Sequence, residues 1–464
     1  MLFNSVEFIF AFLPLTCFIY FLLNRYHLYG YSKIWLLFAS LFFYGWWNPR
    51  YLILLAVSII INFICAKKTA DTIPPYQKKA FLIAGLAFNL GLLVYYKYAD
   101  FFIENLNAVS GSDFNLLYII LPLGISFFTF QQIAYLVDSY RGTVQDFNFL
   151  HYAVFVTFFP QLISGPIVHH KVILPQLLDK KLAHPQATNI AKGIFLFQIG
   201  LAKKIIIADT FGKLVSRGYL NFESLDTIQA WVTTFSYTIQ LYFDFSGYAD
   251  MAIGLGLLFN IKITNNFWSP HKSENIQQFY RRWHITLSNF LRDYLYIPLG
   301  GNRFGEARMH LNLFLTFFLG GLWHGANWTF AIWGALNGLG LIFHRLFQKT
   351  KIYIPHIVAV FMTFIFVLLM RVFFRAEDLN MAVVILKSMF GLAAKVQSFD
   401  LIVSIYDAPI WLAGIVMLFL PNSTEVTEKF ATNRRYLLYT VLMILLNLIF
   451  LNSAGKQDFL YFDF

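Results

Sequence analysis

Charged residues are scarce in this sequence of 464 residues. Asp, Glu, Lys and Arg together make up 13% of the chain, whereas hydrophobic residues make up 58%. Ordinary globular proteins carry about 25% charged residues. The length alone would suggest about three soluble domains, but so little charge excludes a soluble protein.

Cysteine is almost absent. Cys17 and Cys65 both fall within apolar segments, and no Cys/His spacing resembles a structural zinc site, so we expect neither disulfides nor a metal. The first apolar segment lacks a basic n-region and a small-residue cleavage site, which favours a retained helix over a signal peptide. No repeat or Gly/Ser-rich linker divides the chain, and we therefore expect a single transmembrane domain over residues 1–464.

Long apolar runs, in contrast, recur along the whole chain. Several approach the ~20 residues that an α-helix needs to cross a bilayer. We predict an all-α polytopic membrane protein with about 11 or 12 transmembrane helices. The predicted spans lie near residues 6–23, 34–48, 51–65, 80–96, 115–137, 193–208, 228–246, 311–323, 326–344, 353–373, 400–420 and 436–451.

Two regions do not fit a plain helical bundle. Residues 152–168 are apolar but contain Pro160, Gly165 and Pro166, and residues 250–308 mix short apolar runs with charges. Irregular backbone at membrane depth persists only where protein or a water-filled cavity covers it. These regions are therefore the predicted re-entrant segments and the candidate site.

The distribution of positive charge predicts the topology. The net charge is 35 − 24 = +11, which in a soluble protein would suggest nucleic-acid binding. Here the basic residues cluster in short segments between apolar spans, as expected for cytoplasmic loops. The acidic loop around Asp100, with its single lysine, is predicted to be outside. Both termini then fall on the extracytoplasmic side of a bacterial cell membrane, and no nucleic-acid partner is expected.

His324 lies in the segment GGLWHGANW, residues 320–328, between two strongly apolar runs. Its ring is therefore predicted to be buried or to line a cavity, and small neighbours allow backbone or substrate to approach closely. A neutral imidazole is a natural general base for activating a hydroxyl. The alternative is a structural histidine packed between helices and hydrogen-bonded to Asn327.

A second group of polar residues surrounds His284. Arg281, Arg282 and His284 are followed at helical spacing by Ser288 and Arg292. This basic face suits a phosphate-bearing donor or an acidic carrier. A helix at the membrane interface whose arginines contact lipid headgroups explains the charge equally well.

Further polar residues interrupt apolar sequence, including Asp244 and Ser246. An acidic residue in a span could relay protons, which keeps a channel or proton-coupled transporter open as a non-enzymatic alternative. However, the chain lacks the internal repeat and the paired broken helices that are common in transporters.

Several longer motifs accompany these residues in order along the chain. They are residues 1–5 (MLFNS), 121–130 (LPLGISFFTF), 159–166 (FPQLISGP) and 244–248 (DFSGY). With the His284 and His324 segments, they make nearly the whole chain resemble the membrane-bound O-acyltransferase (MBOAT) family. The resemblance is closest to the bacterial branch containing the membrane subunits for alginate and peptidoglycan O-acetylation and the D-alanyl transfer protein of teichoic acid.

The resemblance implies acyl transfer by an MBOAT fold with a central tunnel. In this family the histidine matching His324 is catalytic, and the position matching His284 helps to form the site. Our reading places His284 on the cytoplasmic side and His324 near the outer end of its spans, so the donor would enter from inside and the acceptor from outside. Asp244, Ser246 and Asn327 are candidates for lining this tunnel.

The donor implied by this resemblance is acetyl-CoA or another acyl donor, acting as a substrate, and no bound cofactor is expected. A polyanionic donor cannot cross hydrocarbon, so only the small neutral acyl group need cross. Arg281 and Arg282 are the candidates for binding the donor, on the basis of charge and position.

The C-terminal tail, residues 452–464, ends in the aromatic sequence FLYFDF and is predicted to be extracytoplasmic. Composition alone allows an interfacial aromatic anchor. The tail also resembles a short aromatic motif of this branch in which a tyrosine is proposed to relay the acyl group. Tyr461 is therefore a candidate acyl relay.

The leading hypothesis is a membrane O-acyltransferase that moves acetyl groups from a cytoplasmic donor to a cell-envelope polysaccharide of the alginate or peptidoglycan type. An extracytoplasmic acetyltransferase is the expected partner, because this chain has no large outer domain to hold a polymer. D-alanyl transfer to teichoic acid is the enzymatic alternative.

Overall fold

The computed structural model describes residues 1–392, 408–453 and 459–460, and every regular element in these residues is helical. The first helices are α1 (Leu13–Arg25), α2 (Tyr29–Gly45), α3 (Tyr51–Ala70), α4 (Pro75–Leu93), α5 (Ala99–Ser110), α6 (Ile125–Tyr140), α7 (Phe149–Thr157), α8 (Phe159–Leu162), α9 (His170–Leu178), α10 (Ala187–Ala202) and α11 (Asp209–Leu220). They are followed by α12 (Thr227–Leu258), α13 (Ile276–Arg282), α14 (Ile285–Leu291), α15 (Gly305–His324), α16 (Trp328–Lys349), α17 (His356–Arg375), α18 (Leu379–Met389), α19 (Ala408–Phe419), α20 (Ser423–Glu428) and α21 (Arg434–Ser453).

Short π-helical and 3-10 segments interrupt or join these helices. They are η1 (Phe8–Phe12), η2 (Val94–Tyr98), η3 (Lys203–Ala208), η4 (Phe222–Ser224), η5 (Pro270–Lys272) and η6 (Arg292–Tyr296). Of these, η2 joins α4 to α5 without a break in the helix, so one continuous helical stretch runs over Pro75–Ser110.

Six helical stretches in the described residues are long and apolar enough to cross a membrane. The all-helical, multi-pass architecture predicted from composition is thereby confirmed. The stretches are Phe8–Arg25, Tyr51–Ala70, Pro75–Ser110, Trp328–Lys349, His356–Arg375 and Arg434–Leu451.

Three predicted boundaries are wrong. The span expected near 115–137 becomes α6, which begins only at Ile125 because the preceding residues are not helical and Gly124 adopts a left-handed conformation (φ 72°). The segment around Asp100, expected to be a loop, is instead helix α5. The span expected to end near residue 246 continues to Leu258 as part of α12.

Part of the span predicted near 400–420 lies outside the described residues.

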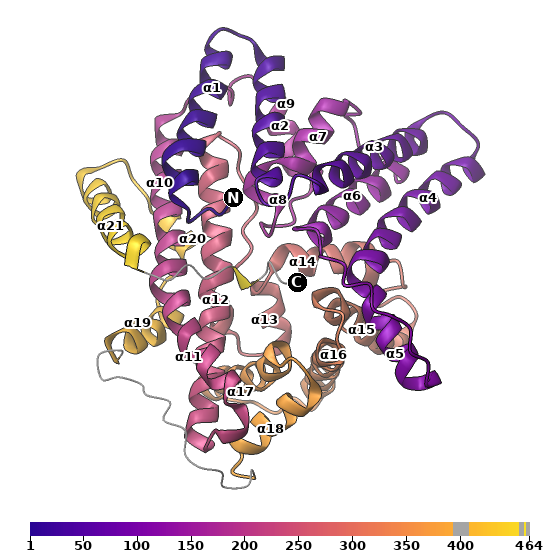
Figure 1. Ribbon diagram of the computed structural model, residues 1–464, viewed down its shortest axis with the longest axis vertical. Helices are drawn as coiled ribbons and strands as arrows, with labels where there is room; N and C mark the ends of the chain where they lie inside the picture. The colour runs from indigo at the N-terminus through magenta and orange to yellow at the C-terminus, as the bar shows by residue number, and fades with distance from the viewer. Residues whose placement is uncertain (393–407, 454–458, 461–464) are drawn as a thin grey trace.

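Helix α12 forms the centre of the molecule (Figure 1). It begins at a capping box, in which Asp226 and Gln229 each accept a hydrogen bond from the other's backbone N–H. Helices α10, α11, α17 and α18 all pack against α12, and nearly all of its C-terminal two-thirds is buried. Other helices therefore enclose α12 along most of its length.

Four glycines bring α10 and α12 into close contact. A Cβ atom at Gly200 would lie 2.5 Å from the carbonyl oxygen of Gly247, and one at Gly254 would lie 2.7 Å from that of Gly193. Small residues are what membrane helices use to let two backbones approach closely. These contacts fix the position of α12, and with it the residues that α12 carries toward the site.

Both regions predicted to be re-entrant are irregular in the structure. Residues 152–168 break at Phe158, between α7 and α8, and their side chains are buried. After α12 the chain continues through the short helices α13, α14 and η6 before α15 begins. The second irregular region therefore starts after Leu258, later than predicted from the sequence.

Candidate active site

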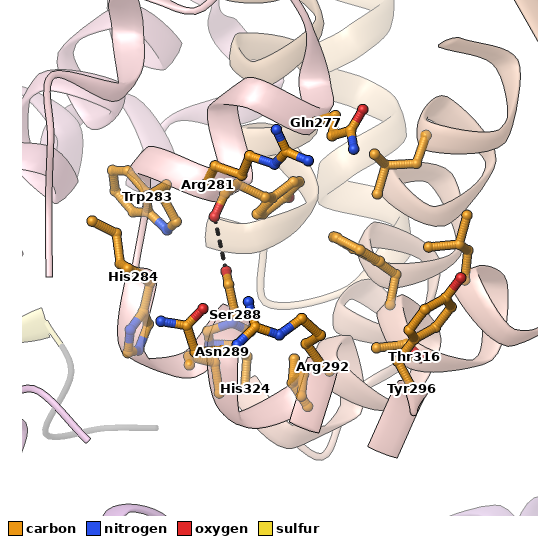
Figure 2. A pocket seen from close by; sticks show the side chains of 18 of the residues that line it. Gln277, Arg281, Trp283, His284, Ser288, Asn289, Arg292, Tyr296, Thr316 and His324 are labelled. Atoms are coloured by element: carbon orange, nitrogen blue, oxygen red, sulfur yellow. Dashed lines mark hydrogen bonds between the residues drawn. The ribbon is translucent and has the colours of Figure 1, made fainter. Parts of the chain in front are cut away.

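A cavity of about 350 Å³ lies between the short helices α13 and α14 and the helix pair α15 and α16. His284 and His324 both line it, although they are separated by 40 residues (324 − 284). Figure 2 shows both histidines at one end of the pocket and Gln277 with Arg281 at the other. The structure therefore brings the two predicted site histidines together.

His284 is held by Asn266. The Nδ1 atom of His284 lies 3.2 Å from Oδ1 of Asn266, which also accepts hydrogen bonds from the backbone N–H and the hydroxyl of Thr286. Because Oδ1 is an acceptor, Nδ1 carries the proton in the neutral ring and Nε2 is the ring's acceptor atom. His284 also adopts a left-handed backbone conformation (φ 45°), which is uncommon for a residue with a side chain and occurs often at functional sites.

His324 is the last residue of α15, and its ring is surrounded by aromatic rings. Its ring centroid lies 5.0 Å from that of Trp323, 5.2 Å from Trp333 and 5.1 Å from Phe374. The exposed fraction is 4% for His324 and 2% for His284. The prediction that His324 is buried and lines a cavity is confirmed.

Small residues beside His324 permit the close packing that the sequence suggested. A Cβ atom at Gly321 would lie 2.4 Å from the carbonyl oxygen of Phe330 on α16, and one at Gly325 would lie 2.2 Å from the ring of Phe330. The glycines thus let α15 and α16 approach closely enough to enclose the histidine.

Positive charge lines the same cavity. Arg281 is among its lining residues, as are Arg292 and Arg345, whereas Arg282 is not. The backbone of Arg282 joins α13 to the preceding segment, because its carbonyl accepts a hydrogen bond of 2.9 Å from the N–H of Trp268. Arg345 lies near the C-terminal end of α16.

Comparison with known proteins identifies the family of this chain. A family model described as MBOAT, membrane-bound O-acyltransferase family, matches residues 136–376, which include both histidines. The chain belongs to the membrane-bound O-acyltransferase family. It is an O-acyltransferase and therefore uses an acyl donor as its substrate.

Individual relatives match over much more of the chain. A peptidoglycan O-acetyltransferase of Helicobacter pylori is 44% identical and is aligned over 100% of this chain and 98% of its own length. A protein of Pseudomonas aeruginosa named "Probable alginate O-acetylase AlgI" is 41% identical over 84% of this chain and 75% of its own. A teichoic acid D-alanyltransferase of Bacillus subtilis is 28% identical over 49% of this chain and 60% of its own.

The three residues suggested as tunnel lining are placed differently in this MBOAT fold. Asp244 and Ser246 are buried on α12 and do not line the 350 Å³ cavity, but Phe245 between them packs 4.8 Å from the ring of His284. Asn327 donates to the carbonyl of Glu377 at 2.7 Å and caps α16 through the N–H of Thr329. The alternative in which Asn327 hydrogen-bonds to His324 is therefore wrong.

Asp244 takes part in a buried ion cluster that reaches the C-terminal tail. Lys204 lies 2.7 Å from Asp244 and 2.9 Å from Asp209. The other oxygen of Asp244 accepts a hydrogen bond of 2.9 Å from the N–H of Leu460, and the Lys204 ammonium lies 4.6 Å from the centroid of the buried Phe459 ring. The described part of the tail is thus inserted into the core. Tyr461 itself lies outside the described residues.

His169 and His170 both contact Asp138. Its Oδ2 atom lies 2.7 Å from His169 Nε2 and 3.1 Å from His170 Nε2. His169 Nδ1 accepts the N–H of Lys171, so Nε2 of the neutral ring carries its proton toward Asp138. Burial lowers the pKa of His170 below its ordinary value, although the hydrogen bond to Asp138 opposes this shift. This pattern fits a hydrogen-bonded junction between α6 and α9.

Proposed function

We propose that this enzyme transfers acetyl groups from a cytoplasmic donor such as acetyl-CoA for the O-acetylation of a cell-envelope polysaccharide, of the peptidoglycan or alginate type. A separate extracytoplasmic transferase would hold the polymer. The observation that carries the proposal is one cavity lined by His284 and His324 together with Arg281, Arg292 and Arg345. Guanidinium groups bind phosphates well, and a buried imidazole can activate a hydroxyl.

In the proposed reaction, Nε2 or Nδ1 of His324 takes the proton of the acceptor hydroxyl. The hydroxyl oxygen attacks the carbonyl carbon of the thioester, the carbon–sulfur bond breaks, and the thiolate leaves and regains a proton. His284 helps to shape the site next to the reacting atoms. Water is largely excluded because both rings are almost fully buried, which strengthens electrostatic interactions within the site.

Acetyl transfer is favoured over the alternatives by the comparisons. The acetyl-transferring relatives align over most of the chain at 41–44% identity, whereas the D-alanyltransferase aligns over 49% at 28% identity. A channel or proton-coupled transporter is disfavoured because the family consists of acyltransferases.

The tail supplies a route to the partner. We propose that the Tyr461 hydroxyl accepts the acetyl group as an ester and passes it to a nucleophile of the extracytoplasmic partner, with the hydroxyl restored. Support comes from the preceding residue: Leu460 is bound to Asp244, whose neighbour Phe245 packs on His284.

The test of the central step is His324→Ala. We expect base-releasable acetate in the envelope to fall at least about 100-fold, the typical contribution of a general base, while the protein still accumulates in the membrane. His356→Ala, at an exposed helix end, is the matched control and should keep wild-type acetylation. Wild-type acetate in the His324→Ala strain would rule out the proposed mechanism.

The relay is tested separately by mass spectrometry of the active protein and by Tyr461→Phe. We expect an acetyl ester on Tyr461 and loss of polymer acetylation in the variant, because phenylalanine lacks the hydroxyl. An active Tyr461→Phe variant, with no acetylated tyrosine in the wild type, would refute the relay and leave the role of His324 intact.

A further inference from the structure

Two neighbouring residues of η2, Lys97 and Tyr98, contact the end of the helix that carries His324. The Lys97 ammonium donates to the carbonyl of Trp323 at 2.5 Å and to that of His324 at 3.2 Å. The Tyr98 hydroxyl donates to the carbonyl of Leu322 at 2.8 Å. Three successive carbonyls at the C-terminus of α15 are therefore bound by two side chains from a segment more than 220 residues away in sequence.

These carbonyls have no partners within α15. The last four carbonyls of any α-helix lack an intrahelical N–H, and here the chain turns to an extended conformation at Gly325 (φ −163°), immediately after His324. No further helical turn can supply donors at this point. The Lys97 ammonium and the Tyr98 hydroxyl supply the missing hydrogen-bond donors. The helix dipole also favours a cation at a helix C-terminus.

The surroundings of Lys97 indicate a dedicated contact. Its ammonium also lies 3.4 Å from the Ser126 hydroxyl and 5.7 Å from the centroid of the Trp323 ring. Within the described part of the chain, it forms no ion pair with a carboxylate. Lysine in an apolar membrane region is energetically costly, and here the ammonium is satisfied by the end of α15.

Both residues are carried by a long helical segment. Lys97 and Tyr98 lie on η2, in the middle of the continuous helical stretch Pro75–Ser110. Such π-helical turns inside α-helices frequently occur at functional sites. Neither residue lines the 350 Å³ cavity; of the residues in this contact, only His324 does.

We propose that Lys97 and Tyr98 are positioning residues, which hold the C-terminal end of α15 and thereby fix the His324 imidazole for catalysis. The proposal rests on the proposed role of His324 as the base. Because the two residues act through His324 and not on the donor, their loss should lower kcat and leave the KM for the donor nearly unchanged. Misplacing a catalytic group by about 1 Å can cost about 100-fold in rate.

The experiment compares Lys97→Met, Lys97→Arg and Tyr98→Phe in membranes containing the full chain. Transfer of radiolabel from acetyl-CoA to base-labile ester is measured against donor concentration, and base-releasable envelope acetate is measured in cells. The controls are Lys33→Met, which removes a partly buried lysine bound to His151, and Tyr51→Phe, which removes a hydroxyl bound to the carbonyl of Ile120.

We expect Lys97→Met to lower kcat about 10- to 100-fold with the donor KM within about twofold. Tyr98→Phe, which removes one oxygen atom, should lower kcat about three- to tenfold, the size of one hydrogen bond. Lys97→Arg should recover most of the lost rate because it keeps a cationic donor. Both control variants should retain the wild-type rate.

Wild-type kcat in both Lys97→Met and Tyr98→Phe would overturn the positioning role. A second outcome would also overturn it: Lys97→Met lowers both kcat and Tm, and Lys97→Arg restores neither. A general folding defect would then explain the lower rate. If His324→Ala is active, the proposed function fails first. If His324→Ala is inactive while both Lys97→Met and Tyr98→Phe keep wild-type rates, only the positioning role fails.

Discussion

His284 and His324 are held in place by different kinds of contact. A hydrogen bond to Asn266 orients the His284 ring, while aromatic rings pack around His324 and Lys97 binds the carbonyl at its helix end. A hydrogen-bonded partner selects which nitrogen of the His284 ring carries the proton. Both rings line one cavity.

Replacing Asn266 by alanine tests the role of its side chain in the site. The variant loses the acceptor for His284 Nδ1 and for the Thr286 N–H and hydroxyl. We expect acetyl transfer to fall at least about tenfold, since outer contacts that orient a functional histidine typically contribute about 10- to 100-fold. The measurement is the initial rate of acetyl transfer per mole of folded protein.

Asn62→Ala is the matched control, because Asn62 is also a buried asparagine but is hydrogen-bonded to Asn89, between α3 and α4. It should lower thermal stability without a comparable fall in rate. A folded Asn266→Ala variant with the wild-type rate would show that His284 needs no such support.

At the scale of helices, the close contact of α10 with α12 determines where the residues of α12 that pack behind the cavity lie. The two helices touch backbone to backbone at two places, one between Gly200 and Gly247 and the other between Gly193 and Gly254. Helix α12 carries Asp244, which binds the tail, and Phe245, which packs on His284. A shift of α12 would therefore move both contacts together.

We predict that Gly247→Val separates α10 from α12 and destabilises the protein. A Cβ atom at Gly247 would lie 2.7 Å from the carbonyl oxygen of Gly200, which is backbone and cannot rotate away. Overpacking of this kind typically costs about 1–3 kcal/mol in the free energy of unfolding. A thermal-shift assay of the purified protein in detergent should record a lower Tm.

Gly91→Ala provides the control for that substitution. Gly91 lies in helix α4, and a Cβ atom there would meet nothing within 4 Å. Alanine is also a better helix former than glycine, so this variant should have an unchanged or higher Tm. An unchanged Tm in Gly247→Val would mean that the two helices can separate without cost.

At the scale of the whole molecule, the basic loops predict how the chain lies in the membrane. The short connection after α3 is preceded by Lys67 and Lys68, while the segment after α5 contains Asp113. Lysines and arginines near span ends are retained in the cytoplasm. We therefore predict that the cavity arginines face the cytoplasm and that both termini lie outside.

Cysteine labelling tests this orientation. In a chain with Cys17 and Cys65 replaced by serine, Asp113→Cys should react with a membrane-impermeant maleimide on intact spheroplasts. Thr72→Cys and Thr350→Cys, both exposed, should react only after permeabilisation. The opposite labelling pattern would reverse the predicted topology and place the donor cavity on the outer side.

The order of amino acids was sufficient to predict a multi-pass helical protein, because twenty apolar residues in a row can be accommodated only in a bilayer or a protein core. It also singled out His324 and His284, since polar residues in apolar sequence are costly and therefore noticeable. The family resemblance carried by the motifs around these histidines was borne out by the family model and by a relative aligned over the full chain.

Other parts of the site depended on the tertiary structure. Lys97 appeared in sequence as the single lysine of an outer loop, yet its ammonium binds carbonyls 226 and 227 residues away. Asn266 and Arg345 likewise carry no local signal of their roles. Asp244 was recognised as a buried acid, but its partners, Lys204 and the backbone of Leu460, are distant in the chain. Local patterns report whether a residue is buried, whereas its partner depends on how helices pack, which no local pattern specifies.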